Sequence, residues 1–460
     1  MRSPVGSCLR AALSVATLFY VTMTMAKGPA ASDRASDRLV VHEWGTFTSL
    51  HDENGKAIAG INADDEPVPQ FVHRIADFLV IQSGSVPALA QGAPHCHPDV
   101  TMRLETPVVY FHPPRDAELP MSVDVEVAFP GGWLSEFYPA AEVDAPGVKG
   151  HMSFGAATDD TVGRLRWNDL QIGTEGAGPK TDSHVWLAPR AVKAANVTTT
   201  GGESERYLFY RGVGRVESPL RVSRDPADQS LVVTANFASV QPDESIQYTV
   251  PAMWLVEIRE DTSCAYRTLD GFQFANGDEP KVVARTAGHF EASDFDKKNF
   301  TQLLADMRAA LIADGLFTDE ANALLGTWKQ SYFQTPGLRL FYLLPREWTD
   351  RALPMRLSQE ADIVRTMVGR VEIVTPEQRQ LLSRIAAGPA STTQWMFSCA
   401  AVNVPEDYSA YQRLGRFRNA LLLDELNRRP TPALKDVVTN YGLWGFSPSN
   451  SASATAPAKK

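Results

Sequence analysis

Residues 39–50, LVVHEWGTFTSL, have the composition of a β-strand, because β-branched and aromatic residues fill their apolar positions. Successive side chains of a strand point to opposite faces, so His42 is expected on one face and Glu43 on the other. Only a bulge at Gly45 would re-aim the chain and bring both side chains toward one partner. The stretch is therefore predicted to be a strand in which His42 and Glu43 have different surroundings.

The same residues lack the signature of a zinc metalloprotease. That signature, HExxH, needs a second histidine four residues after the first, on a helix, and position 46 is threonine. His42 and Glu43 are thus not a catalytic pair by themselves. His42 alone is a candidate site residue, and the alternative is a hydrogen-bonded histidine beside Trp44.

The chain continues to read as β-structure up to about residue 290. DENG, residues 52–55, contains an Asn-Gly turn that favours a hairpin after the first strand. Short β-branched and aromatic runs separated by Pro, Gly and Asp follow: TPVVYFH (106–112), SVDVEVAF (122–129), RLRWNDLQI (164–172), RYLFYRGV (206–213), LRVS (220–223), SLVVTANF (230–237) and QYTVPAMWLVEIRE (247–260). Residues 39–290 are predicted to form an antiparallel, sandwich-like β-rich domain, with an open barrel-like sheet as the alternative.

Helical patterns begin after residue 290, and two strands lie between them. The segments with helical spacing or caps are NFTQLLADMRAALIADG (299–315), DEANALLGTWKQSYF (319–333, with Thr318 as cap), TPEQRQLLSRIAAGP (375–389) and EDYSAYQRLGRFRNALLLDELNRR (406–429). The two strands are LRLFYLL (338–344) and VRTMVGRVEIV (364–374). The fold class is therefore α+β, with a mixed α+β part at residues 291–445 following the β-rich part.

The N-terminus has the three-part plan of a secretory signal peptide. Two arginines precede an uncharged apolar stretch, and small residues follow before a cut after Ala26. We expect residues 1–26 to be the signal peptide, 27–38 a polar leader and 446–460 a disordered tail. The alternative is an uncleaved anchor, but the apolar run is short for a membrane span. The protein is predicted to be exported to the periplasm or beyond the cell.

Charge and hydropathy narrow the classes of partner. The formal net charge is -10 and the sequence pI is about 5.5, with no face rich in Lys and Arg, which argues against nucleic-acid binding. No later segment is long and apolar enough to cross a bilayer, so no integral membrane segment is expected in the mature chain. The expected partner is a small molecule, a glycan or a peptide.

Histidine is unevenly distributed, which points to a metal site. Six of the nine histidines fall between residues 42 and 112. In APHCHPD, residues 93–99, the prolines favour extended geometry, so His95 and His97 are expected on one side and Cys96 on the other. Two imidazoles so placed form half of a transition-metal site. The other expected ligands are His42 and His112, with His73 as a further option.

Glu105 is the candidate ligand or catalytic base of this predicted site. Three protein ligands with an open position favour a metal-dependent hydrolase or oxidoreductase, and ligand type alone does not distinguish zinc, copper and iron. The alternative is a proline-flanked surface loop with solvated histidines and with Cys96 oxidised to a partner. The other mature cysteines, Cys264 and Cys399, lie in segments that look structured and could form one disulfide in an oxidising compartment, which would leave Cys96 over.

Metal-free catalysis has less support in the sequence. There is no GxSxG, SxxK or CxxC motif and no phosphate loop, and RGVGRVE lacks the third glycine of a dinucleotide loop. A weaker pattern is the presence of Glu105, Arg211, Arg370 and Glu372 inside apolar strands. Buried charges usually occur in pairs, so a structural salt bridge is expected, and a carboxylate-recognising arginine is the alternative.

Several segments together resemble a group of exported bacterial proteins that begin with an HEWGTFT stretch and have no assigned activity. They are VHEWGTFTS (41–49), ETPVVYF (105–111), YLFYRGVG (207–214), LFYLLPREWTD (340–350) and MVGRVEIVTPEQ (367–378). The resemblance covers nearly all of the mature chain, which implies that the whole unit recurs. It implies no activity, cofactor or catalytic residue.

The leading hypothesis is an exported, soluble protein that binds one transition metal ion through its N-terminal histidines and acts as a metal-dependent enzyme outside the cytoplasm. The alternative is a non-enzymatic extracytoplasmic binding protein. In that case a β-sandwich would display aromatic surface around Trp133 or Trp186 to a glycan or peptide.

Overall fold

The computed structural model describes residues 36–63, 68–75, 89–90, 93–149, 153–277, 282–328, 332–333, 335–387, 392–397, 400–405, 411 and 413–440. The predicted signal peptide, most of the predicted leader and the predicted tail lie outside the described residues.

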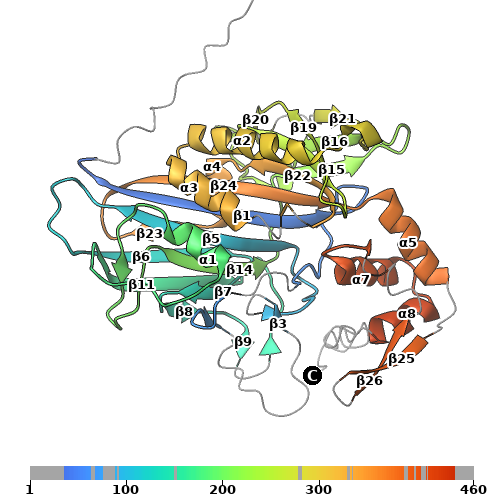
Figure 1. The fold of residues 1–460 in the computed structure, drawn as a ribbon, viewed down its shortest axis with the longest axis horizontal. Helices are drawn as coiled ribbons and strands as arrows, with labels where there is room; N and C mark the ends of the chain where they lie inside the picture. Colours follow the sequence, from blue (N-terminus) through green and yellow to red (C-terminus); the bar gives the residue numbers. More distant parts are fainter. Residues whose placement is uncertain are drawn as a thin grey trace, which may run out of the picture. The chain divides into compact units, whose positions relative to one another are not determined.

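The strand predicted from residues 39–50 is confirmed as β1 (Leu39–His51), and it lies in the interior of a large mixed sheet (Figure 1). In order across the sheet, the strands are β13 (Ser204–Glu205), β12 (Val197–Thr198), β11 (Val162–Ile172), β7 (Gly132–Tyr138), β14 (Leu208–Gly214), β5 (Met102–His112), β1, β24 (Ala361–Ile373), β22 (Gly337–Leu343), β18 (Met253–Ile258) and β19 (Cys264–Leu269). Four more join at its side: β2 (His73–Arg74), β6 (Met121–Pro130), β8 (Glu142–Asp144) and β23 (Met355–Leu357).

Smaller sheets accompany the large one. Their strands are β3 (Leu89–Ala90) with β4 (Ala93–Pro94), β9 (Val148–Lys149) with β10 (Ser153–Phe154), β15 (Leu220–Arg224) with β16 (Leu231–Ala235) and β21 (Val282–Thr286), β17 (Gln247–Val250) with β20 (Phe272–Ala275), and β25 (Thr392–Phe397) with β26 (Ala400–Pro405).

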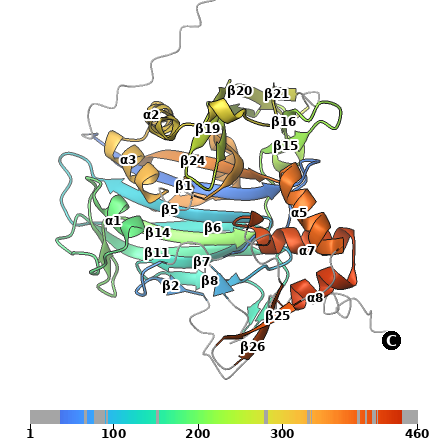
Figure 2. The same cartoon turned by 45° about the vertical axis from the view of Figure 1, so that its right-hand side comes forward.

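Strand β1 connects the two predicted parts of the chain. It pairs antiparallel with β5 on one edge and parallel with β24 on the other, and β24 lies beyond residue 290 (Figure 2). Strands from both parts therefore share one sheet. The predicted α+β class is confirmed, and the large sheet is mixed because β24 runs parallel to β1.

The helices are α1 (His184–Arg190), α2 (Lys297–Ala313), α3 (Thr318–Thr327), α4 (Arg346–Ala352), α5 (Pro376–Ala387), α7 (Arg418–Arg428) and α8 (Pro432–Asn440), with 3₁₀ turns at Phe237–Ser239 and Ala292–Asp294. Helices α2, α3, α5 and α7 fall in the predicted helical segments, whereas α1, α4 and α8 were not predicted. The predicted capping box of α5 is confirmed: Gln378 N donates to Thr375 Oγ1 at 3.3 Å, and Thr375 N donates to Gln378 Oε1 at 2.9 Å. Helix α3 begins at Thr318 with Phe317 as its cap, one residue earlier than predicted.

Helices α1, α2 and α3 cover one face of the large sheet. Trp44 of β1 is fully buried there, in a hydrophobic cluster that includes Met307 of α2, Leu324 of α3 and Phe341 of β22. Phe47 belongs to the cluster on the other face. Because β1 is paired along both edges and covered on both faces, its polar side chains are buried and require partners inside the protein.

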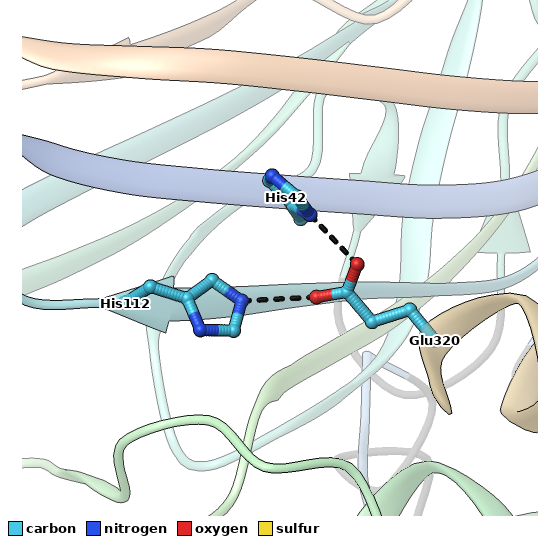
Figure 3. Close-up of side chains that lie close together, drawn as sticks. All are labelled: His42, His112 and Glu320. Carbon is cyan, nitrogen blue, oxygen red and sulfur yellow. Dashed lines mark hydrogen bonds and ion pairs between the residues drawn. The ribbon is translucent and has the colours of Figure 1, made fainter. Parts of the chain in front are cut away.

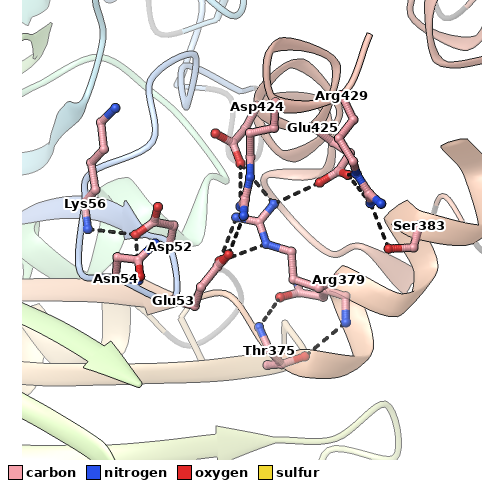
Figure 4. A network of polar contacts seen from close by, with 12 residues as sticks. Asp52, Glu53, Asn54, Lys56, Thr375, Arg379, Ser383, Asp424, Glu425 and Arg429 are labelled. Carbon is pink, nitrogen blue, oxygen red and sulfur yellow. Dashed lines mark hydrogen bonds and ion pairs between the residues drawn. The ribbon is translucent and has the colours of Figure 1, made fainter. Parts of the chain in front are cut away.

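A network of ion pairs connects the turn after β1 with helices α5 and α7 (Figure 4). Arg379 of α5 donates to Glu53 at 2.9 Å and to Asp424 of α7 at 3.0 Å. Arg428 of α7 donates to the other oxygen of Glu53 at 2.6 Å. Glu53 is therefore the residue of this turn that contacts both helices.

Replacing Glu53 with glutamine is expected to flatten the acid dependence of stability. Burial by itself raises the pKa of Glu53, but the hydrogen bond from Arg428 and the nearby charge of Arg379 outweigh it and hold that pKa at about 2, below the ordinary 4.5. The pKa of Glu53 is lower in the folded protein than in the unfolded chain. The ion pairs of Glu53 therefore stabilise the fold fully above about pH 4.5, and this stabilisation disappears as the pH falls toward 2. Melting temperatures measured from pH 6 to pH 2 should fall less steeply in Glu53→Gln than in the wild type.

Glu217→Gln is the control for this measurement, because Glu217 forms an exposed pair with Arg221 at 3.7 Å and is about half exposed. Its acid slope should match that of the wild type, since exposed pairs contribute little to stability. Equal slopes in the wild type and in Glu53→Gln would contradict the prediction.

Candidate metal-binding site

His42 and His112 lie on the same face of the sheet because of the register between β1 and β5. His42 is opposite Tyr110, and His112 is opposite Val40, so the two histidines are diagonal neighbours across the pair. Their ring centroids are 5.2 Å apart and the rings meet edge to face. The structure therefore brings together two of the four predicted metal ligands.

Glu320, in the first turn of α3, completes the group (Figure 3). His42 Nδ1 lies 2.7 Å from Glu320 Oε2, and His112 Nε2 lies 2.9 Å from Glu320 Oε1. The carboxylate also accepts the backbone N–H of Phe317 at 2.8 Å, which fixes its direction. Each carboxylate oxygen thus faces one imidazole.

The group is buried and has an aromatic wall. His42, His112 and Glu320 are each 5% exposed or less. The Phe317 ring stacks on His42 at 4.5 Å and meets His112 edge to face at 5.1 Å. Burial by itself raises the pKa of Glu320, but hydrogen bonds from His112 and His42 outweigh it and bring that pKa to about 2. Glu320 is therefore a carboxylate at neutral pH.

These three residues have the donor set of a transition-metal site. Each offers one ligand atom, and the three atoms lie within 4.8 Å of one another. Two imidazoles and a carboxylate suit zinc and non-haem iron, and they leave coordination positions for water or substrate. Within the described part of the chain this group contains neither His95 nor His97.

Glu43 belongs to a different network on the opposite side of β1. Its carboxylate accepts hydrogen bonds from the Tyr210 hydroxyl and from Arg365 Nε, the latter at 2.5 Å. The pairing of β1 with β5 does shift at Gly45, but the extra residue is in β5, beside Thr106, whose φ is 49°. The irregularity lies after both residues, so His42 and Glu43 keep opposite faces, as the strand pattern predicted.

His95 and His97 are not arranged as the extended geometry predicted. Cys96 has a φ of 55°, so the segment turns there instead of continuing as a strand. His95 Nδ1 contacts Cys96 Sγ at 3.0 Å. His97 Nδ1 accepts the backbone N–H of Asp99 at 3.3 Å, and Nε2 donates to Gly155 O at 3.1 Å, so both nitrogens of His97 are engaged.

Glu105, the predicted ligand or base, lies among arginines instead of beside His42 and His112. It forms an ion pair with Arg103 at 3.2 Å and another with Arg416, and it accepts the Thr48 hydroxyl at 2.8 Å. Burial by itself raises the pKa of Glu105, but the charges of Arg416, Arg103 and Arg370 outweigh it and hold that pKa far below its usual range. A carboxylate held so firmly in its charged form is a weak proton acceptor.

Two further histidines have structural partners. His51 Nδ1 accepts the backbone N–H of Val222 at 3.3 Å, so the neutral ring presents its Nε2–H to Ser49 Oγ, also at 3.3 Å, and cannot accept the proton of Ser49. Burial, followed by the charge of Arg221, lowers the pKa of His51 to about 3, which keeps it neutral. His73 pairs with Glu203 at 2.9 Å in a partly exposed position.

The aromatic residues named for the binding-protein alternative are interior residues. Trp133 is fully buried and Trp186 is 1% exposed, so neither presents aromatic surface to a ligand. Cys264 is a buried free thiol, and Cys399, its predicted partner, lies outside the described residues.

The sequence contained only a weak signal for Glu320. An acidic residue in the first turn of a helix is favoured by the helix dipole and by free N–H groups. From its sequence position, Glu320 is therefore an ordinary first-turn residue. What distinguishes it is complete burial, which comes from the packing of α3 onto β1 and β5.

None of the helices in the described part of the chain is long and apolar enough to cross a membrane. In comparisons with known proteins, no family model and no curated protein matches this chain.

Proposed function

We propose that this protein binds one transition metal ion through His42, His112 and Glu320. The observation that carries the proposal is the convergence of two imidazole nitrogens and one carboxylate at a buried point, within 4.8 Å of one another. His42 and His112 were expected as ligands from the sequence, and Glu320 takes the place that was expected for Glu105.

The geometry needs only a small change to accept an ion. The nitrogen-to-oxygen distances of 2.7 and 2.9 Å are hydrogen-bond distances. Ligand atoms around an ion with bonds of about 2.1 Å are about 3 to 3.5 Å apart. Moving each side chain by less than about 1 Å would therefore suffice, and Phe317 N–H would keep holding the carboxylate from outside the coordination sphere.

Charge also supports a cation at this point. Glu320 is ionised and fully buried, and its two carboxylate oxygens face ring nitrogens of His42 and His112, side chains that bind metals in their neutral form. When bound, a divalent ion would supply Lewis acidity and an activated water or oxygen ligand. The residues of the chain would hold and orient it, while the Phe317 ring limits the access of water. The proposed activity is that of a metal-dependent hydrolase or oxidoreductase.

The proposal places this activity outside the cytoplasm, because the first 26 residues resemble a cleaved signal peptide. Membership of the HEWGTFT group and the sandwich-like arrangement of the N-terminal strands are further parts of the same proposal. They are supported by sequence pattern alone.

One preparation tests both export and metal binding. The protein should be recovered from outside the cytoplasm of an exporting host, purified without tag or chelator, and examined by intact mass and elemental analysis. We expect a chain that begins at Lys27 and carries about one transition metal ion. A chain that retains residues 1–26 would contradict export, and a metal content below about a tenth of an ion per chain would contradict the metal site.

A further inference from the structure

A second cluster of buried charges lies farther along the same sheet. Arg339 of β22 is directly opposite Glu372 of β24, and Arg370 is two residues before Glu372, so the three side chains share one face. Both arginines are fully buried, and Glu372 is 8% exposed. The covering aromatic residue is Tyr332, whose ring lies 4.3 Å from the Arg370 guanidinium carbon.

The two guanidinium groups share a single carboxylate oxygen. Arg370 Nε donates to Glu372 Oε1 at 2.7 Å, and Arg339 Nε lies 3.1 Å from the same oxygen. Arg339 uses its other nitrogens on the backbone, donating to Tyr332 O at 2.5 Å and to Thr335 O at 2.8 Å. Among the described residues, Arg370 Nη1 is buried and has no hydrogen-bond partner.

Neighbouring charges add to the positive potential. Arg416 and Arg103 both form ion pairs with Glu105, which also accepts the hydroxyl of Tyr332. Burial is the largest influence on Arg339 and lowers its pKa, and the charges of Arg370 and Arg416 lower it further, against the attraction of Glu372, to about 10. A guanidinium whose pKa falls in this way lacks sufficient negative charge around it.

Arg365, on the same strand, is a buried arginine with more negative charge beside it. It is 4% exposed and pairs with two carboxylates: Glu43 at 2.5 Å and Asp350 at 3.0 Å, the second of which also pairs with Arg346. Burial by itself lowers the pKa of Arg365, but the charge of Glu43 outweighs it and raises that pKa. Five residues later, Arg370 shares the single carboxylate of Glu372 with Arg339.

We propose that Arg370 and Arg339 bind a small oxoanion, namely the phosphate or carboxylate group of a ligand. Arg370 Nη1 supplies the unused donor, and a charge-assisted hydrogen bond from a guanidinium to a phosphate or carboxylate oxygen is strong. Arg339, whose nitrogens face Glu372, Tyr332 O and Thr335 O, adds its positive charge. The bound anion compensates the charge that Glu372 leaves uncompensated. This site is separate from the histidine group, because it is built from β22 and β24 and not from His42, His112 or Glu320.

Thermal unfolding of the purified full chain tests the proposal. Inorganic phosphate and malonate are the two probes, each compared with sodium chloride at the same ionic strength. At a concentration about a hundred times the dissociation constant, phosphate or malonate should raise the melting temperature by about 2–4 °C. The more effective probe identifies the phosphate or the carboxylate class.

Arg370→Gln should abolish this rise, and it should also lower the melting temperature in chloride, because Arg370 forms a buried ion pair with Glu372. Arg365→Gln is the matched control: it should lower the melting temperature in chloride and keep the rise with the anion. Glu320→Gln should also keep the rise, which separates this site from the proposed metal site.

An equal response in Arg370→Gln and the wild type would overturn the proposal, as would a wild type that responds to neither probe. Equilibrium dialysis of the wild type against labelled phosphate and labelled malonate requires no variant. About one anion per chain supports the site, and less than about a tenth for both probes overturns it.

Discussion

Replacing Glu320 with glutamine is expected to lower the bound metal from about one ion per chain to less than a tenth. Glutamine keeps the size of the side chain and can still hydrogen-bond to Phe317 N–H, but it removes the only charged ligand of the group. A neutral amide oxygen is a poor ligand for zinc or iron. The measurement is elemental analysis of protein purified without chelator, with circular dichroism to verify the fold.

His97→Ala is the matched control, because His97 was predicted as a ligand from the sequence, yet the structure gives it other partners, Asp99 and Gly155. It should retain the metal, whereas His112→Ala should lose it. If His97→Ala loses the ion and Glu320→Gln keeps it, the metal site lies at APHCHPD instead, and the site proposed here is wrong.

The second large effect is on stability. Glu43→Gln is expected to lower the free energy of unfolding by about 3–5 kcal/mol, because it removes one partner of a buried ion pair. The side chain of Glu43 is fully buried, its carboxylate holds Arg365 Nε at 2.5 Å, and it accepts the hydroxyl of Tyr210. The loss leaves the Arg365 charge beside the half-exposed Asp350, which also pairs with Arg346. Urea unfolding at pH 7 measures the difference.

Glu203→Gln provides the comparison, since Glu203 pairs with His73 where both side chains are about one third exposed. Glu203→Gln should lower the free energy of unfolding by about 1 kcal/mol or less. Arg365→Met in the Glu43→Gln background should recover part of the lost stability, because it removes the unpaired charge. If Glu43→Gln lowers the free energy of unfolding by as little as Glu203→Gln does, the structural role assigned to Glu43 is contradicted. Metal content should be unchanged in Glu43→Gln.

These two predictions assign neighbouring residues to different tasks, and the sequence alone supported that separation. Alternation along a strand depends only on local backbone geometry, so His42 and Glu43 could be placed on opposite faces before any tertiary contact was known. For the same reason, the strands at β5, β11, β14 and β24 and the helices α2 and α5 were predictable. Each has its own apolar period or capping pattern within a few turns of chain.

Local geometry was also the reason that one prediction failed. His95 and His97 were placed on one side of an extended segment because prolines flank them. Proline restricts the residue before it, but it does not restrict Cys96, which adopts a φ of 55° and turns the chain. The prediction that Glu105 serves a metal site rested on its place in the same N-terminal portion as the histidines. Its polar character in an apolar strand predicted a buried salt bridge instead, and Arg103 and Arg416 are the partners.

The sequence by itself determined the element types, the α+β class and the separate faces of His42 and Glu43, because these depend on interactions between residues close along the chain. Only the tertiary structure decided which polar residues meet. Glu320 reaches His42 across 278 positions and His112 across 208, and Arg339 meets Arg370 through the pairing of β22 with β24. Such contacts depend on sheet order and register, which are set by the burial of the whole core and leave no periodic pattern near the residues they join.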